Sequence, residues 1–363
     1  MYYREIGVSR YAFGPLGLDP GDFLKECRDF VVVERPAIEW SERGLAVYRL
    51  AKEGVDTLTA LAWLRRAARL GSVGYAGLKD ANSLSVQYVT ASCRDCPALV
   101  ELPWGRAELV GRALSHARRG RLEANSFAVR LGGLEGAKAE DLVSSLSSER
   151  GPRILNYFGP QRFGVSRPLN SELGLMLLNR DLEGFKRALE SKPELGWWER
   201  LAVKAEALEE LLEGPTRIAV ELAVSAYQAL VFNRCLSEAA EEGRVSSKSI
   251  GLLPGLGLSK LSKLSWIDAR FAECVFSSVE GDGLTEEDFA LSGALRLRAR
   301  ARPLSVRVEG LRASSSRRGG AAIAFSLPSG SYASIFLREL FGESIEWLTR
   351  RCKRRVFASP HDY

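Results

Sequence analysis

The chain of 363 residues is 46% hydrophobic and 26% charged, a composition that suits two or three globular domains with buried cores and excludes a chain that is disordered throughout. Its formal net charge is +6 and 40 of its 51 basic residues are arginine, so we expect a polyanionic partner, although the arginine excess also fits a high-temperature or GC-rich source. The sequence has neither an apolar run near the roughly 18 residues that span a bilayer nor a signal-peptide core, so we expect a cytosolic protein without a membrane segment.

The first predicted elements are two strands and a helix. Residues 29–35 form a β-branched run that is ended by a proline, and residues 44–52 form a second strand-like run. A helix capped by Asp56 or Thr57 follows and ends at Gly71. The chain then enters the stretch on which the functional interpretation depends.

The stretch from Val73 to Val89 sets one carboxylate in a loop between two apolar runs. Val73 to Ala76 is typical of a short buried strand, and residues 83–89 alternate between apolar and polar side chains as a second strand does. Asp80 therefore lies at a strand end beside the cation of Lys79, and Gly77 lets the backbone turn tightly or approach a ligand. The residues alone predict either an active-site loop or a hairpin whose Lys-Asp pair is merely solvated.

A basic turn separates the next two predicted strands, residues 107–115 and 121–131. It is either a solvated hairpin tip or a phosphate contact, and its basic residues are His116, Arg118, Arg119 and Arg121.

The cysteines give little indication of a metal site. Cys93 and Cys96 form the only C-x-x-C pattern of the chain, and a zinc site needs a second pair nearby, so we expect no metal. A disulfide between these two cysteines is expected mainly in a hyperthermophile.

The middle of the chain changes from strands to amphipathic helices at about Asn170, which suggests a separate lobe as far as Arg302. The predicted helices cover residues 172–179, 181–190, 201–212 and 218–241. The glycine-rich segment 251–258 lacks the G-K-[ST] ending of a phosphate loop, so we expect no nucleotide cofactor.

Arginines alternate with apolar residues near the end of this lobe. Arg296, Arg298, Arg300 and Arg302 occupy every second position, which in a strand puts four guanidinium groups on one face. Such a stripe is either a phosphate track or the protected edge of a sheet. A helix is then predicted through residues 332–340.

Four motifs together resemble one enzyme family. Gly77-Leu78-Lys79-Asp80, with Ser83, Ser85 and Gln87 at fixed offsets, resembles the G-x-K-D-x-x-A-x-T-x-Q signature of the TruD family of RNA pseudouridine synthases, with serines in place of the commoner Ala and Thr. Three more motifs follow in the order of that family, at residues 156–164 (NYFGPQRFG), 225–233 (SAYQALVFN) and 327–333 (LPSGSYA). The resemblance therefore spans nearly the whole chain.

The resemblance implies an α+β fold, in which a catalytic domain with a mixed, mostly antiparallel sheet carries a largely helical inserted domain. The catalytic domain would consist of residues 1–169 and 303–363, and the insertion of residues 170–302. It also implies an enzyme that isomerises a flipped-out uridine to pseudouridine in tRNA, at position 13, without a cofactor or metal. We expect a monomer.

The same resemblance assigns roles to individual residues. Asp80 would be the catalytic group, supported by Lys79, Lys25 and Gln87, although Lys25 stands one residue nearer to Phe30 than the family pattern predicts. The uridine would be held by Phe30, Asn156, Phe158 and Tyr332. Contacts to the RNA backbone are expected from Arg118, Arg119, Arg162, Arg296, Arg298 and Arg300.

Two other classes of function compete with this interpretation. An RNA-binding protein without activity needs only the basic faces and aromatic residues. A metal-dependent nuclease needs clustered carboxylates and histidines, which the sequence lacks.

Overall fold

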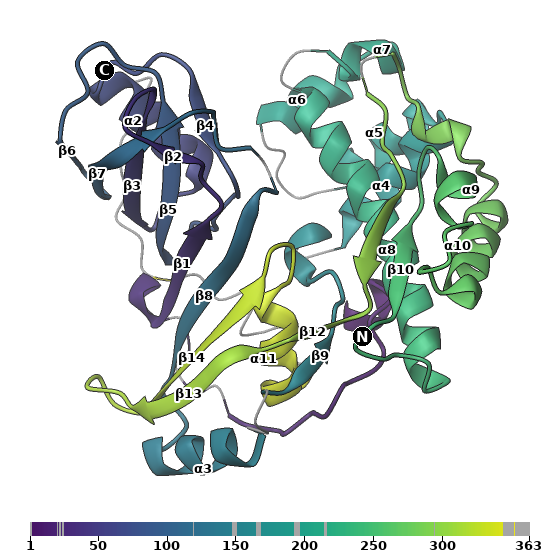
Figure 1. Ribbon diagram of the computed structural model, residues 1–363. Helices are drawn as coiled ribbons and strands as arrows, with labels where there is room; N and C mark the ends of the chain where they lie inside the picture. Colours follow the sequence, from purple (N-terminus) through teal and green to yellow (C-terminus); the bar gives the residue numbers. More distant parts are fainter. Residues whose placement is uncertain are drawn as a thin grey trace. The chain divides into compact units, whose positions relative to one another are not determined.

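The computed structural model describes residues 2–19, 21, 23, 25–118, 120–146, 151–164, 168–191, 197–213, 216–293, 295–343 and 352. The chain divides into two compact units, each built from three separate segments. Unit 1 contains residues 1–15, 154–306 and 334–345, and unit 2 contains residues 16–153, 307–333 and 346–363. Figure 1 labels their helices and strands.

A mixed sheet forms the centre of unit 2. In the described part of the chain it has ten strands, in the order β13-β14-β8-β1-β5-β3-β7-β2, with β4 paired to β5 and β6 paired to β7. The β1–β5 pairing is parallel, and the other pairings are antiparallel. The strands are β1 (Phe30–Pro36), β2 (Trp40–Ser41), β3 (Leu45–Glu53), β4 (Val73–Tyr75), β5 (Leu84–Ala91), β6 (Leu99–Leu102), β7 (Gly105–Ala113), β8 (Leu122–Leu131), β13 (Glu309–Ser315) and β14 (Ala321–Pro328). The expected α+β class with a mixed, mostly antiparallel sheet is confirmed.

Helix α2 (Thr57–Ala67) covers part of this sheet because one of its faces is apolar. Asp56 caps the helix, its side chain accepting a hydrogen bond from the amide of Thr59. Ala60, Leu61 and Leu64 pack into a buried cluster with strand residues that include Tyr48, Leu50 and Val89. A second helix, α3 (Gly136–Leu146), packs against β13 and β14.

One of the two alternatives for the basic turn, a hairpin tip between the strands at residues 107–115 and 121–131, is wrong. Strand β7 lies between β3 and β2, whereas β8 lies between β14 and β1, so the two strands are not neighbours. The basic turn is therefore a crossover connection between distant places in the sheet. Local alternation predicted both strands, but pairing partners depend on contacts that are remote in sequence.

Unit 1 is largely helical and is organised around the 26-residue helix α8 (Thr216–Glu241), which packs against α4, α6, α7, α10 and β10. Its middle is apolar on most sides, as expected for a central helix. The other elements are α1 (Tyr2–Glu5), α4 (Leu169–Leu178), α5 (Leu182–Glu190), α6 (Trp197–Val203), α7 (Leu208–Leu211), β10 (Ile250–Leu253), α9 (Leu258–Leu261), α10 (Ala269–Gly281) and β11 (Arg300–Pro303). Helix α11 (Ala333–Phe341) and the short paired strands β9 (Arg153–Leu155) and β12 (Ser305–Arg307) stand where the chain passes from one unit to the other.

Two predictions for this unit are corrected. The predicted helix over residues 201–212 is interrupted, because α6 ends at Val203 and α7 begins at Leu208. The four arginines near β11 do not share one exposed face. Arg296, Arg298 and Arg300 are exposed, but Arg302 is half-buried, with its guanidinium carbon 4.0 Å from the centre of the Phe158 ring.

Three disulfides bond all six cysteines of the chain, each of which lies among the described residues. The two cysteines of the C-x-x-C pattern, Cys93 and Cys96, form a disulfide with each other. No local pattern indicated the other two disulfides, Cys27–Cys352 and Cys235–Cys274, because their partners are far apart in the chain. Among the described residues, no helix is both long and apolar enough to cross a membrane.

Candidate active site

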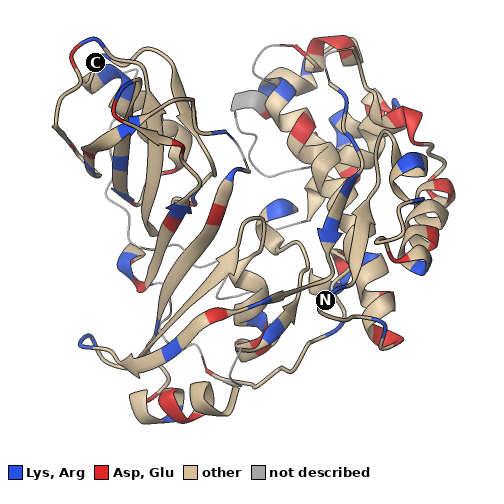
Figure 2. Ribbon diagram, viewed as in Figure 1, with Lys and Arg blue, Asp and Glu red and all other residues tan. Residues whose placement is uncertain are grey.

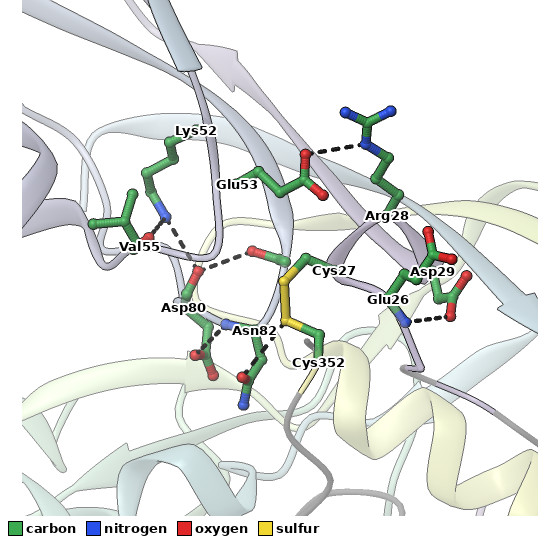
Figure 3. Close-up of a disulfide and its surroundings, with 11 residues drawn as sticks. Glu26, Cys27, Arg28, Asp29, Lys52, Glu53, Val55, Asp80, Asn82 and Cys352 are labelled. Carbon is green, nitrogen blue, oxygen red and sulfur yellow. Dashed lines mark hydrogen bonds and ion pairs between the residues drawn. A yellow bond between two sulfur atoms is a disulfide. The ribbon is translucent and has the colours of Figure 1, made fainter. Parts of the chain in front are cut away.

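Asp80 lies in the loop between β4 and β5 of unit 2, and its side chain is exposed. The carboxylate Oδ1 accepts a hydrogen bond of 3.0 Å from the amide of Asn82, which closes a tight turn. The carbonyl of Asp80 accepts a bond of 2.9 Å from the hydroxyl of Ser83. Figure 3 shows the carbonyl of Asp80 directed toward Lys52 and its carboxylate directed away from that side chain. The loop therefore fixes its main chain on one side and presents the carboxylate on the other.

The face of β5 beside this loop is polar and buried, the reverse of ordinary alternation. Ser83, Ser85 and Gln87 are fully buried, whereas the apolar residues between them, such as Leu84 and Val86, are half-buried. Burying polar side chains is costly unless they are hydrogen-bonded. The Ser83 hydroxyl bonds the carbonyl of Asp80, and Gln87 is connected to the loop through a hydrogen bond with Thr57.

Thr57 connects Gln87 to the loop. The Thr57 hydroxyl accepts a hydrogen bond of 2.8 Å from the amide of Lys79 and donates one of 2.9 Å to Oε1 of Gln87. Gln87 therefore supports Asp80 through Thr57 and the main chain of the preceding residue, and its contact is not made with the carboxylate. Among the residues that the structure describes, Gln87 Nε2 and the Ser85 hydroxyl are buried and have no hydrogen-bond partner.

Lys79 forms a buried ion pair with Glu34 of β1. Its ammonium lies 2.7 Å from Glu34 Oε2, and the two side chains are only 6% and 1% exposed. The second carboxylate oxygen of Glu34 accepts a bond of 3.3 Å from the amide of Tyr88. In this structure, then, the cation next to Asp80 in sequence neutralises a different carboxylate.

Lys52 of β3 was missed in the sequence, and it lies directly beneath the loop. Its side chain is completely buried. Its ammonium donates hydrogen bonds of 2.6 and 3.1 Å to the carbonyls of Val55 and Asp80 (Figure 3) and one of 3.3 Å to the carbonyl of Lys79. Burial lowers the pKa of Lys52 to about 8, although the nearby carboxylates of Asp56 and Asp80 act to raise it. Lys52 follows Tyr48 and Leu50 at every second position, so it continues the buried face of the strand. This spacing is the sequence signal that could have identified it.

Phe30 begins β1 at the same end of the sheet as the loop. The next residue, Val31, pairs with Leu84, so Phe30 is level with the segment that follows Asp80. The ring is half-buried and stacks on Phe127 with 5.9 Å between centroids. Lys25 lies exposed just before the short 3-10 helix Cys27–Asp29 that precedes the strand.

The motif that contains Tyr332 is tied to the same region of unit 2. The hydroxyl of Ser329 donates to the carbonyl of Gly120 over 3.3 Å, and the amide of Gly120 donates to the carbonyl of Ala76 over 2.8 Å. Tyr332 is half-buried and stands one residue before α11. Phe30, Tyr332 and Asp80 therefore all belong to unit 2.

Asn156 and Phe158 lie in unit 1 and are almost completely buried, at 4% and 7% exposure. The amide group of Asn156 accepts a bond of 2.8 Å from Arg302 and donates one of 2.9 Å to the carbonyl of Pro303. The Arg302 guanidinium lies against the Phe158 ring, and Asn233 of the third motif bonds the main chain of Phe158. The third motif thus holds the second one in place.

The predicted phosphate-binding arginines have different surroundings. Arg118 is exposed in the crossover, and Arg119 lies outside the described residues. Arg162 is half-buried, with its guanidinium carbon 5.9 Å from the Phe158 ring centre. The arginine stripe, defined as Arg296, Arg298 and Arg300, is exposed along the segment that leads into β11, where Figure 2 marks basic residues.

Within the described ranges, no group of three or more histidine, cysteine, aspartate or glutamate side chains is arranged to hold a metal ion.

Comparison with solved structures first establishes the fold. The crystal structure of a putative tRNA pseudouridine synthase D from Methanosarcina mazei superposes with a TM-score of 0.61 and 20% identity, covering 95% of this chain and 98% of that one.

Sequence comparison then establishes the family. The model of "tRNA pseudouridine synthase D (TruD)" matches residues 5–210 and 264–340. A tRNA pseudouridine synthase D from Anaeromyxobacter sp. (strain Fw109-5) is 30% identical over 356 residues, covering 90% of this chain and 94% of that protein. A probable tRNA pseudouridine synthase D from Methanopyrus kandleri is 28% identical, covering 82% and 85%. The chain belongs to the tRNA pseudouridine synthase D family.

Proposed function

We propose that the protein isomerises uridine to pseudouridine in tRNA, at position 13, with Asp80 as the catalytic group. Members of the family are isomerases, and the relatives with 30% and 28% identity carry the name of this activity. The observation that carries the proposal is the exposed carboxylate of Asp80, presented from a loop whose main chain is bonded by the buried side chains of Lys52, Thr57 and Ser83.

The reaction breaks the bond between C1′ of the ribose and N1 of uracil and forms a bond between C1′ and C5. The proton on C5 passes to solvent, and N1 gains one, so the reaction needs neither an oxidant nor a reductant. An ionised carboxylate either attacks carbon or balances the positive charge that develops at the sugar. Both roles need a carboxylate fixed in place and accessible to the substrate, as Asp80 is.

The uridine has to leave its base stack before this chemistry, and aromatic rings are the side chains that hold a displaced base. Phe30 and Tyr332 fit this role in unit 2, because both are half-buried.

The test is direct formation of pseudouridine. The protein is incubated in EDTA with transcribed tRNA that carries uridine at position 13, and a matched transcript carries cytidine there. We expect pseudouridine at position 13 of the first transcript only. Binding of tRNA without any pseudouridine would instead identify an RNA-binding protein, and loss of activity in EDTA would indicate a metal-dependent reaction.

A further inference from the structure

The buried ammonium of Lys52 is a charged group that the family resemblance did not assign. It is surrounded by main-chain carbonyls, and two of the three that it bonds belong to Lys79 and Asp80. A charged donor makes shorter and stronger hydrogen bonds than a neutral one. Taking an ammonium out of water also costs free energy. The burial of Lys52 next to this loop therefore suggests that its bonds to the loop have a function.

We propose that Lys52 is a positioning residue for the isomerisation, and that its ammonium holds the main chain of Lys79 and Asp80 in the conformation that presents the Asp80 carboxylate to the uridine. The inference rests on the proposed function. Lys52 bonds the carbonyl of Asp80, while the carboxylate points away from it (Figure 3), so Lys52 acts through the backbone and does not touch the substrate.

The other groups near the loop cannot replace this contact. The ammonium of Lys79 is bound to Glu34. Among the described residues, the hydroxyl of Thr57 bonds the main chain of Lys79 and the side chain of Gln87, and not the carbonyl of Asp80. Ser83 bonds that carbonyl as a neutral donor. Among these groups, Lys52 alone brings a positive charge to the main chain of Asp80.

The first test is Lys52→Met, which keeps the shape of the side chain as far as the ε carbon and removes the ammonium group. Misplacing a catalytic group by about 1 Å can cost roughly 100-fold in rate. We therefore expect the single-turnover rate constant to fall about 100-fold, with the Kd for tRNA changed by less than about twofold. The matched control is Lys138→Met, on the exposed face of α3, which should leave both constants unchanged.

The second test uses the wild-type protein and does not depend on how the variant folds. The charged groups that face Lys52 are Asp56, Asp80 and Lys79, and burial lowers the pKa of Lys52 to about 8. The single-turnover rate constant should therefore fall about tenfold between pH 7 and pH 9 as Lys52 loses its proton. Circular dichroism and tRNA binding, measured at each pH, should stay constant.

Each outcome decides the matter. A Lys52→Met rate constant within threefold of wild type would overturn the positioning role. A variant that is slow but retains the wild-type pH dependence would also overturn it, because a different group would then be titrating. A wild-type protein that forms no pseudouridine would remove the proposed function and this role together.

Discussion

The ion pair between Glu34 and Lys79 should contribute strongly to stability as a pair, because neither side chain can reach bulk solvent. The side chains of Lys79 and Glu34 are only 6% and 1% exposed and lie 2.7 Å apart, so removal of either partner leaves a buried charge without compensation. The cost of such a break is about 3–5 kcal/mol. Glu34→Gln is nearly isosteric, so we expect a loss of this size in the free energy of unfolding, with little effect from shape.

The double variant Glu34→Gln/Lys79→Met separates the charge effect from other consequences. Because the double variant removes both charges, its loss of unfolding free energy should be smaller than the sum of the losses of the two single variants by at least about 1 kcal/mol. Stability is measured by urea denaturation followed by circular dichroism at pH 7. The control is Glu135→Gln, which breaks the exposed Lys138–Glu135 pair and should leave the midpoint almost unchanged. A Glu34→Gln loss no larger than that of the control, with additive double-variant energies, would refute the reasoning.

The other predictions concern RNA binding, base stacking and alkaline stability. Replacing the arginine stripe by alanine should make the log–log salt dependence of tRNA binding shallower by roughly one unit per lost phosphate contact, and an unchanged slope would leave the stripe a role in edge protection only. Tyr332→Phe should keep most of the activity while Tyr332→Ala loses it, because stacking needs the ring and is worth about 1–3 kcal/mol; equal loss in both would show that the hydroxyl matters. Burial raises the pKa of Tyr157 to about 12, so this residue stabilises the fold fully below pH 10 and loses that effect as the pH rises to about 12. Tyr157→Phe should accordingly reduce the loss of unfolding free energy between pH 9 and pH 12 by about 2 kcal/mol, and an identical loss in both proteins would contradict this.

Local patterns in the sequence predicted most of the helices and about half of the strands, because each of these elements has its own periodicity, whereas strands such as β13 and β14 were not predicted. The strand at residues 29–35, the capped helix at Asp56 and the long helix that became α8 were all found in this way. Features that depend on contacts between residues far apart in the chain were not predicted. The crossover between β7 and β8 looked like a hairpin, and the disulfides Cys27–Cys352 and Cys235–Cys274 link positions that no local pattern connects.

The candidate site was predictable only through its motifs. They identified Asp80 and Gln87, but the support of the loop comes from strands whose charged residues look unremarkable in sequence. Lys52 and Glu34 each continue the buried face of a strand, two residues after Leu50 and Val32 respectively. A charged residue in phase with a buried face is a signal that could have identified both, because such a position is favourable only when a partner is present. The partners themselves, the loop carbonyls and Lys79, could be found only from the folded chain.

The central claim is that Asp80 carries the chemistry, and Asp80→Asn tests it most directly. The amide is nearly isosteric, and Asn can still accept the hydrogen bond from the amide of Asn82, so the fold and tRNA affinity should be retained. An amide can neither attack carbon nor balance positive charge at the sugar. Uridine tritiated at C5 reports the reaction, since the label leaves when C5 bonds to C1′.

With enzyme in excess over tRNA, wild-type protein should release the tritium, and Asp80→Asn should bind the tRNA within a few-fold of wild type and release none. The preparation is checked by mass spectrometry for deamidation back to aspartate. Appreciable tritium release by a homogeneous Asp80→Asn protein would contradict the account and assign the catalytic role to another group.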